Sequence, residues 1–452
     1  MSAHASERRG GACSERMLRI IALAVMVAYP GIHLALSPPH LFADGTDFFL
    51  GLLNQKGFHI WDKPRMFAQL LTQFPTVLAL GSGIRGVGTL GMIFGGSLLL
   101  VPSLLWIAAA SLHLQTQYFW NVATAYAIVY LPTSLFAIGE FNVCYAINAL
   151  VLALLLVRPF RTPHATLAAL LSIANILTYP SNVLLAPAVI ALLLCKLDPT
   201  WGSWLVGPEN AARDSRQTLI KGCLLVAVVA YSSAFLISLW VNLFPRDASM
   251  ASAARDPRNL GLYSGLLIGG ILSGWIPRVK AKTVALLWMS LAALDLLWLP
   301  FLMRALIETP ENAYTLRTAI ALGLLLCLVV QPIQMQRHAL RFASDRRLLQ
   351  SGFCCLLVLV LAGTGLIRAN AFRHWLQDYR KELAVIENEV PINLTRLPES
   401  PYYKFNWGWN NFQLSRILDP MGGKLILNAT DRVGWQPDRS LLPMLSTQGY
   451  HP

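Results

Sequence analysis

Apolar runs of about twenty residues recur along the whole chain, and no other feature constrains its fold as strongly. A helix of that length crosses the roughly 30 Å of hydrocarbon in a bilayer. Of the 452 residues, 55% are hydrophobic and 13% are charged, whereas a soluble domain carries about 25% charged residues. We therefore expect an all-α polytopic membrane protein with about eleven transmembrane helices.

Loop charge orients the predicted spans. The spans are residues 17–37, 88–112, 118–138, 141–157, 164–178, 181–196, 219–243, 259–276, 283–303, 315–333 and 350–368. Lys and Arg cluster in alternate loops, such as those around 158–161 and 278–282, and basic loops stay in the cytoplasm. An odd number of spans then predicts a multi-pass protein of the bacterial inner membrane, with a cytoplasmic N-terminus and a periplasmic C-terminus. The two short spans beside Tyr179-Pro180-Ser181 could instead form one broken helix, which would reverse all later orientations.

Two regions follow from this topology, a transmembrane domain over 1–369 and an extracytoplasmic C-terminal region over 370–452. An amphipathic helix is predicted to continue outward from the last span. Its apolar positions are Phe372, Trp375, Leu376, Tyr379 and Leu383. The stretch Lys424–Leu427 is typical of a strand. The C-terminal region is therefore expected to be a small α+β tail.

The net charge of +13 does not indicate nucleic acid as a partner. No basic stripe is interleaved with exposed aromatic residues, which is the pattern that nucleic-acid binding requires. No His, Cys or acidic cluster has metal-ligand spacing either, so no metal site is predicted, although a divalent metal remains compatible with the sequence. Membrane lipids are the partners that the composition implies.

The first outer loop, residues 38–87, contains two amphipathic stretches at helical spacing. One apolar stripe consists of Phe48, Phe49, Leu52 and Leu53. The other consists of Met66, Phe67, Leu70, Leu71 and Phe74, opposite Gln69, Thr72 and Gln73. Both stretches suit helices that lie flat in the membrane interface, with the apolar stripe toward the lipid.

Asp44 and Asp47 stand at the start of the first of these helices. A carboxylate near the bilayer surface can act as a general base on a hydroxyl group. The same two residues also suit a helix N-terminus, with Asp44 as the N-cap and Asp47 in the first turn. The spacing alone leaves both interpretations open.

Basic residues are present on the same predicted outer face. Lys63 and Arg65 begin the second loop helix, where the free N–H groups of the first turn favour a phosphate, although an arginine here could also simply extend to the interface. Arg255 and Arg304 lie in later outer loops, against the positive-inside trend. These four side chains are the candidate anion-binding groups.

Several of these features resemble membrane glycosyltransferases of the GT-C superfamily. The resemblance rests on the span order, on Asp44-Gly45, Lys63-Pro64-Arg65 and Phe74-Pro75, and on Trp407-Gly408-Trp409 with Leu427-Asn428 in the tail. It implies an enzyme that transfers a sugar from a polyprenyl-phosphate donor to a glycan or lipid acceptor on the outer face, for cell-envelope polysaccharide synthesis. The base would be Asp44, with Asp47 next in line, because the usual adjacent acidic pair is absent.

The chemistry of such a transfer and the predicted topology give roles to other residues. The donor phosphate would bind Arg65, Lys63, Arg255 and Arg304, which stabilise the leaving group. Glu140, Tyr179 and Asn182 would border the acceptor cavity, unless Glu140 is only a solvated loop end. Two alternatives remain. A transporter or flippase of lipid-linked sugars would show internal repeats, and an O-antigen ligase or polymerase would have its main outer loop late in the chain.

Overall fold

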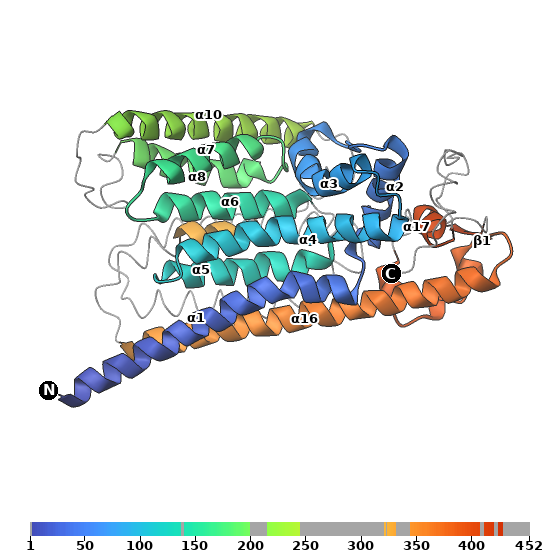
Figure 1. Cartoon of the computed structure of the whole chain (residues 1–452), viewed down its shortest axis with the longest axis horizontal. Coiled ribbons are helices and arrows are strands. Elements are labelled where there is room, and N and C mark those ends of the chain that lie inside the picture. Colours follow the sequence, from blue (N-terminus) through green and yellow to red (C-terminus); the bar gives the residue numbers. More distant parts are fainter. Residues whose placement is uncertain are drawn as a thin grey trace. The chain divides into compact units, whose positions relative to one another are not determined.

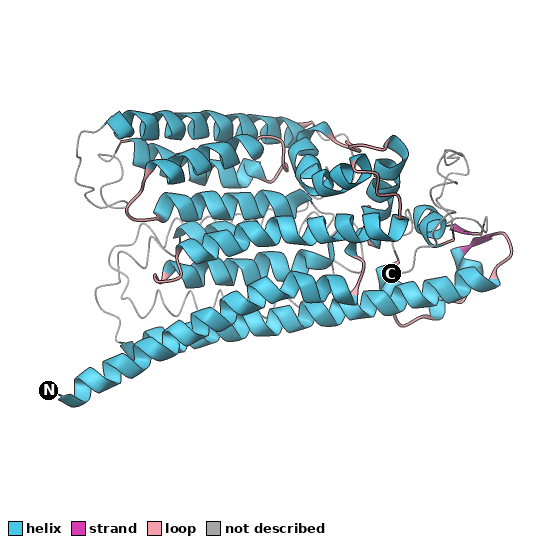
Figure 2. Cartoon of the chain, in the orientation of Figure 1, coloured by secondary structure: helices cyan, strands magenta, loops and turns pink. Residues whose placement is uncertain are grey.

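A computed structural model describes residues 2–136, 140–198, 215–244, 321, 323–330, 344–406, 411–419 and 424–427. This part of the chain is mostly helical (Figure 2). The predicted spans 259–276 and 283–303, most of 315–333, and the candidates Arg255 and Arg304 lie outside these residues. The motif Trp407-Gly408-Trp409 does too.

Four long helices correspond to predicted spans. They are α1 (Ser2–Leu36), α4 (Val87–Leu112), α10 (Ser215–Leu243) and α16 (Ser344–Val385). In the described chain, these four are long and apolar enough to cross a membrane. On α10, Leu225, Val229, Leu236 and Trp240 are exposed at helical spacing, so one apolar side of this helix faces outward. The predicted total of about eleven spans stays a prediction.

Three further apolar helices are shorter than a full span. They are α6 (Glu140–Leu156), α7 (Thr162–Ala174) and α8 (Asn182–Leu197). The turn around Pro180 separates α7 from α8, and both helices pack against α10 (Figure 1). The 13 residues of α7 rise only about 20 Å, which is less than the hydrocarbon thickness.

The predicted span 118–138 is not a uniform α-helix. It begins as α5 (Tyr118–Ala125), widens into the π-helix η3 (Tyr126–Tyr130) and tightens into the 3-10 helix η4 (Leu131–Phe136). A second π-helix, η5 (Leu326–Val330), packs against α5. The Tyr118 hydroxyl donates to the Leu328 carbonyl at 3.1 Å, and the Asn121 amide donates to the Cys327 carbonyl at 2.9 Å. The altered helix repeat leaves carbonyls for side chains to bind.

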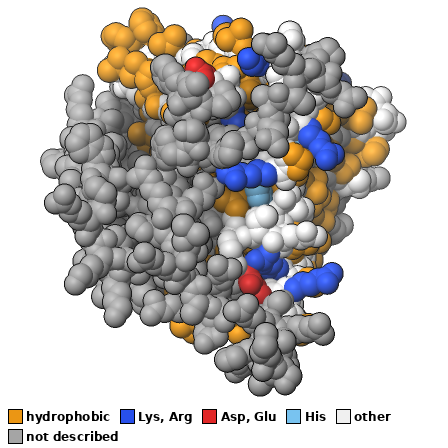
Figure 3. Space-filling model, turned by 90° about the vertical axis from the view of Figure 1, so that its left-hand side faces the viewer, with side chains coloured by type: hydrophobic (Ala, Val, Ile, Leu, Met, Phe, Trp, Pro, Cys, Tyr) orange, Lys and Arg blue, Asp and Glu red, His pale blue; other side chains and the backbone are white. Residues whose placement is uncertain are grey.

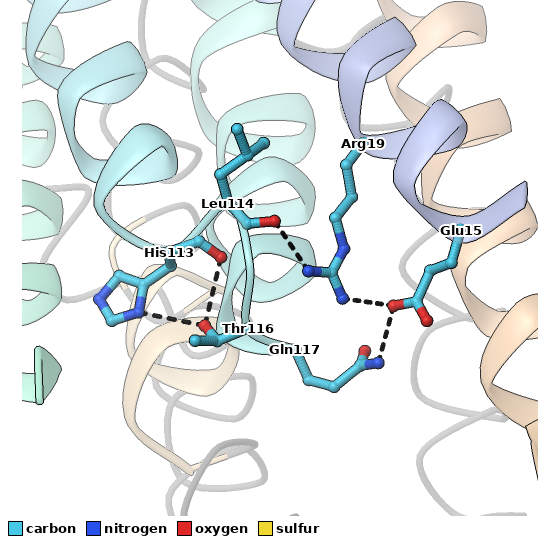
Figure 4. A network of polar contacts seen from close by, with 6 residues as sticks. All are labelled: Glu15, Arg19, His113, Leu114, Thr116 and Gln117. Atoms are coloured by element: carbon cyan, nitrogen blue, oxygen red, sulfur yellow. Dashed lines mark hydrogen bonds and ion pairs between the residues drawn. The ribbon is translucent and has the colours of Figure 1, made fainter. Parts of the chain in front are cut away.

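The chain divides into two compact units. Unit 1 consists of Met1–Val25, Leu105–Pro132 and Cys144–Leu361, and unit 2 of Met26–Leu104, Thr133–Val143 and Ala362–Pro452. In unit 1, Arg19 is buried, forms an ion pair with Glu15 and donates to the Leu114 carbonyl at 2.8 Å (Figure 4). Gln117 donates to the same Glu15 carboxylate at 2.8 Å. These contacts hold α1 against the turn between α4 and α5.

Basic side chains are visible on the side of the molecule at which the N-terminus lies in Figure 1. Figure 3 shows this face, with Lys and Arg side chains spread among hydrophobic ones. Arg158 and Arg161 lie in the short loop that follows α6, and Lys196 lies in the last turn of α8. Lys196 lies over the ring of Phe160, with its ammonium nitrogen 4.8 Å from the ring centroid.

In unit 2, the first loop forms η1 (Pro39–Leu41), α2 (Gly45–Gln55), η2 (Lys63–Arg65) and α3 (Met66–Gly81), so both predicted loop helices are present. A Cβ at Gly45 would lie 2.5 Å from the carbonyl oxygen of His40. Only glycine therefore allows η1 to approach the start of α2 so closely.

The apolar stripe of α2 is buried inside unit 2, so the expectation that it faces lipid is wrong. Phe48, Phe49, Leu52 and Leu53 are all buried. Phe49 stacks on Phe94 of α4, with ring centroids 5.9 Å apart. An apolar stripe is stabilised equally by lipid and by a protein core, and here the core covers it.

The C-terminal region packs on this loop within unit 2. As predicted, α16 continues beyond the last span, and Phe372, Trp375, Leu376, Tyr379 and Leu383 are buried. Phe42 of the loop contacts Phe372 and Phe405, with ring centroids 5.1 and 6.3 Å away. The region continues with β1 (Glu389–Pro391), the 3-10 turns η7 (Ile392–Leu394), η8 (Leu397–Glu399) and η9 (Tyr403–Phe405), α17 (Asn411–Leu418) and β2 (Leu425–Leu427).

A short parallel ladder and α17 complete this region. Strands β1 and β2 pair with Val390 opposite Ile426. The Tyr379 hydroxyl of α16 donates to the Asn411 carbonyl at 2.9 Å and lies 2.9 Å from the Ser415 hydroxyl. Helix α17 is thereby held by α16, and it also packs against α2.

Candidate functional site

The two predicted catalytic carboxylates lie in different surroundings. Asp44 precedes α2, is exposed, and its side chain makes no N-cap hydrogen bond. Asp44 therefore occupies the predicted N-cap position of α2, with a helical backbone and without the side-chain hydrogen bond that usually accompanies it. Asp47 lies one turn later and is half-buried.

Burial changes the acidity of Asp47. Loss of hydration raises the pKa of this carboxyl above its ordinary value of 3.8, because the charged form is disfavoured away from water. His59 and a hydrogen bond from the Gln413 side chain act in the opposite direction, and burial dominates. Gln413 belongs to α17, so the C-terminal region reaches the first-loop carboxylate.

His59 is held firmly beside Asp47. Its backbone N–H donates to Gln73 Oε1, and its carbonyl accepts from Gln73 Nε2, both at 2.8 Å. Its ring meets Phe48 edge-on at 5.8 Å, and its Nδ1 lies 3.0 Å from Gln55 Nε2. A Cβ at Gly51 would be 2.5 Å from this ring, so glycine is required there. Within the described chain, the buried His59 Nε2 has no hydrogen-bond partner.

Arg65 and Glu140, predicted separately, are brought together in unit 2. Arg65 Nη1 lies 3.6 Å from Glu140 Oε2, and Arg65 Nε lies 3.2 Å from Asp62 Oδ2. Gln69 Nε2 donates to Glu140 Oε1 at 3.1 Å. Glu140 is buried, so it is not a solvated loop end. Since two carboxylates already neutralise Arg65, a phosphate bound there would have to displace one of them.

Helix α3 carries its polar side inward. Gln69, Thr72, Gln73 and Thr76 are buried, whereas Phe74 and Leu78 are 57% and 60% exposed. The buried glutamines form hydrogen bonds with the loop before α3. Gln73 Oε1 accepts from the His59 N–H, and Gln69 Oε1 accepts from the Trp61 N–H at 3.2 Å. A helix on the surface of a soluble protein has the reverse arrangement. Lys63, just before α3, is exposed.

The predicted cavity residues Tyr179 and Asn182 lie in unit 1 and are buried. Asn182 Oδ1 accepts from the amides of Asn148 and Asn175, both at 3.1 Å, and its Nδ2 donates to the Asn175 carbonyl at 3.0 Å. The Tyr231 hydroxyl of α10 donates to Asn148 Oδ1 at 3.1 Å. This network joins α6, α8 and α10, so hydrogen bonds within the fold account for the polar atoms of Asn182. Its contact with an acceptor stays a prediction.

One buried polar stripe was not predicted from the sequence. Tyr29 and His33 lie near the end of α1 and Ser37 lies just after it, at helical spacing, and all three are buried in unit 2. The Tyr29 hydroxyl lies 2.5 Å from the Ser134 hydroxyl, and Arg368 of α16 is within electrostatic range of Tyr29 and His33. Ionisable side chains at the ends of predicted spans were the available signal, because such groups are costly in hydrocarbon.

In the described part of the chain, no group of three His, Cys, Asp or Glu side chains could hold a metal ion. No protein-family model, curated protein or solved structure matches the chain. The geometry of unit 2 is thus the basis for a functional assignment.

Proposed function

We propose that the chain is a multi-pass membrane glycosyltransferase of the GT-C kind, acting on the extracytoplasmic face. It transfers a sugar from a polyprenyl-phosphate donor to a hydroxyl group of a glycan or lipid acceptor. One observation carries the proposal: a half-buried carboxyl with a raised pKa, Asp47, lies in the first loop beside His59 and Gln413. Titratable groups in such surroundings are typical of catalytic sites.

The reaction needs one base. The acceptor oxygen attacks C1 of the sugar, the bond between C1 and the phosphate oxygen breaks, and the phosphate leaves with the electron pair. The acceptor proton passes to the carboxylate. Among the two candidates, Asp47 is favoured over the exposed Asp44, because a carboxylate with a raised pKa accepts a proton more readily.

The outward apolar side of α3 supports a site at the membrane surface. Phe74 and Leu78 are suited to contact lipid, while the other side of the same helix holds the loop that carries His59. A lipid-linked donor keeps its tail in the bilayer and its phosphate at the depth of the headgroups. Lys63 is exposed near this helix, and Arg255 and Arg304 are further candidates for the same phosphate.

Transfer by purified protein in proteoliposomes tests the proposal, with radiolabelled polyprenyl-phosphate sugars as donors. Asp47→Asn should lower transfer by roughly 100-fold or more, the loss expected when a general base is removed, and should leave donor binding intact. Asp44→Asn should have a smaller effect. The exposed Asp198, which follows α8 in unit 1, provides the matched control Asp198→Asn. Full activity in both Asp47→Asn and Asp44→Asn would rule out the mechanism.

A transporter of lipid-linked sugars is the second candidate, and the irregular helices favour it. The succession of α5, η3 and η4 interrupts the α-helical repeat within a predicted span, as in transporters whose broken helices line a path. The same proteoliposomes separate the two functions. Movement of the labelled lipid-linked sugar across the bilayer without any new glycosidic bond would favour the transporter.

A further inference from the structure

Two buried polar atoms beside Asp47 lack partners in the described chain. One is Nε2 of His59, and the other is Oε1 of Gln413. They come from different parts of unit 2, the loop before α3 and the tail helix α17. A buried polar atom without a partner costs free energy, so a ligand that supplies the missing hydrogen bonds of both atoms would be stabilised here.

The hydrogen bonds of each side chain determine what its unpartnered atom offers. Gln413 donates its amide to the Asp47 carboxylate, and its oxygen is left as an acceptor. At His59, Nδ1 faces the amide nitrogen of Gln55, which can only donate. With Nδ1 facing this donor, Nε2 carries a hydrogen and is itself a donor.

The cluster thus combines a donor, an acceptor and a carboxylate. A hydroxyl group both donates and accepts, so two or three hydroxyls of one molecule would satisfy the whole set. A sugar ring provides such neighbouring hydroxyls. A simple lipid alcohol has only one hydrogen to donate, so it could not bond to both the Gln413 oxygen and the Asp47 carboxylate.

We propose that Asp47, His59 and Gln413 form a carbohydrate-binding subsite, and that α17 of the tail is part of it. Its assignment as the acceptor subsite rests on the proposed function, and it narrows the acceptor to a glycan or another polyhydroxylated group. Hydrogen bonds hold both segments that carry the subsite in place. In the loop before α3, the Gln73 side chain forms two hydrogen bonds with the backbone of His59. In the tail, the Tyr379 hydroxyl holds α17, and the Ile426 N–H donates to Ser415 Oγ of that helix at 3.1 Å.

Protection of Asp47 from a carbodiimide tests this assignment without any donor or turnover. Full-length protein in lipid nanodiscs is labelled with the reagent, alone or with methyl pyranosides of glucose, galactose and mannose, and Asp47 modification is measured by mass spectrometry. At least one glycoside should protect Asp47 in a saturable manner. The exposed Glu387 in the same sample should be unprotected and serves as the internal control.

Substitution of Gln413 provides the second measurement. Gln413→Leu should weaken glycoside protection about tenfold, the loss expected for a hydrogen bond to a charged or buried site. For each variant, protection is the ratio of Asp47 labelling without glycoside to labelling with glycoside. A ratio is needed because losing the Gln413 hydrogen bond also alters the reactivity of Asp47 toward the reagent. The exposed Gln377 of α16 offers the matched control Gln377→Leu. In this variant, glycosides should protect Asp47 as well as they do in the unsubstituted protein. If Gln413→Leu fails to fold, the similarly shaped Gln413→Met replaces it.

The outcomes separate the two proposals. Absence of protection by every glycoside, or equal protection in Gln413→Leu, would overturn the carbohydrate subsite even if Asp47→Asn abolishes sugar transfer. Saturable protection that depends on Gln413 would support the subsite even if no transfer is detected, and only the proposed reaction would then fail.

Discussion

At the scale of single residues, the site depends on the burial and the hydrogen-bond partners of the carboxyl groups in unit 2. Asp47 is half-buried and accepts a hydrogen bond from the neutral Gln413 amide. Burial disfavours its ionised form, so the carboxylate accepts a proton more readily. Glu140 is buried as well, but Arg65 and Gln69 contact its two oxygens. The first arrangement suits proton transfer, whereas the second suits the joining of two segments.

The pH dependence of stability should reveal the cost of ionising Asp47. Because folding raises its pKa, the folded state retains this proton to higher pH than the unfolded chain does. Its stabilising contribution is complete below the ordinary pKa of 3.8 and is lost as the pH rises through the raised value. Asp47→Asn, which cannot ionise, should therefore raise the Tm at neutral pH, and the gain should disappear below about pH 4.

Thermal unfolding in detergent across this pH range checks the prediction. Glu399→Gln, at an exposed position of the tail, should change the Tm little at any pH. A Tm difference for Asp47→Asn that does not depend on pH would contradict the assigned burial effect.

Glu140 should behave as a structural residue. Glu140→Ala leaves Arg65 without one of its carboxylates and removes the acceptor of Gln69, so we expect a loss of roughly 3 kcal/mol in unfolding free energy. Glu140→Gln keeps an acceptor oxygen and should cost about half as much. Denaturant unfolding of both variants, with Glu387→Gln as the exposed control, measures this difference. Equal stability of all three variants would show that the ion pair contributes nothing.

At the scale of elements, α2 and α3 use their amphipathic patterns in opposite ways. The apolar stripe of α2 is buried, whereas α3 buries its glutamines and threonines and exposes Phe74 and Leu78. The polar side of α3 is stabilised by hydrogen bonds to the preceding loop, so this helix can leave its apolar side for lipid. Such a helix would anchor the site at the membrane surface.

Spin labelling tests the surroundings of α3. In a background without the native cysteines, a nitroxide attached at Phe74→Cys should collide readily with oxygen, which concentrates in lipid, and rarely with a water-soluble nickel complex. A label at Glu387→Cys in the exposed tail should have the opposite preference. A water-like profile at position 74 would mean that this side of α3 does not contact lipid.

At the scale of the whole molecule, the number of spans decides whether the tail lies on the same side of the membrane as the first loop. Four helices of the described chain are long enough to cross a bilayer, and three shorter apolar helices accompany them. Loop charges favour an odd total, with the N-terminus inside and the tail outside.

Labelling of spheroplasts with an impermeant maleimide tests that orientation. In a variant that retains only the exposed Cys13, the thiol should react only after the membrane is permeabilised. In a cysteine-free background, Glu387→Cys should react from outside. Reaction of both thiols from the same side would require an even number of spans and would place the predicted orientation in error.

Features that depend on local pattern could be predicted from the sequence. Runs of apolar residues predict long helices because a helix satisfies its own backbone wherever it lies. For the same reason, the two loop helices and the continuation of α16 follow from the spacing of a few apolar side chains. The position of Asp44 and Asp47 at the start of a helix belongs to this class too.

Other features depend on packing between distant segments, and only the tertiary structure decided them. An apolar stripe looks the same whether lipid or a protein core covers it, so the burial of α2 could not be read from its residues. Nor does any local pattern indicate that Arg65 meets Glu140, or that Gln413 of the tail reaches Asp47. Sequence alone therefore determined the apolar helices and the candidate acids. The packing of the first loop against α17 decided which acid is half-buried, because burial and the pKa that it sets come from neighbours remote in the chain.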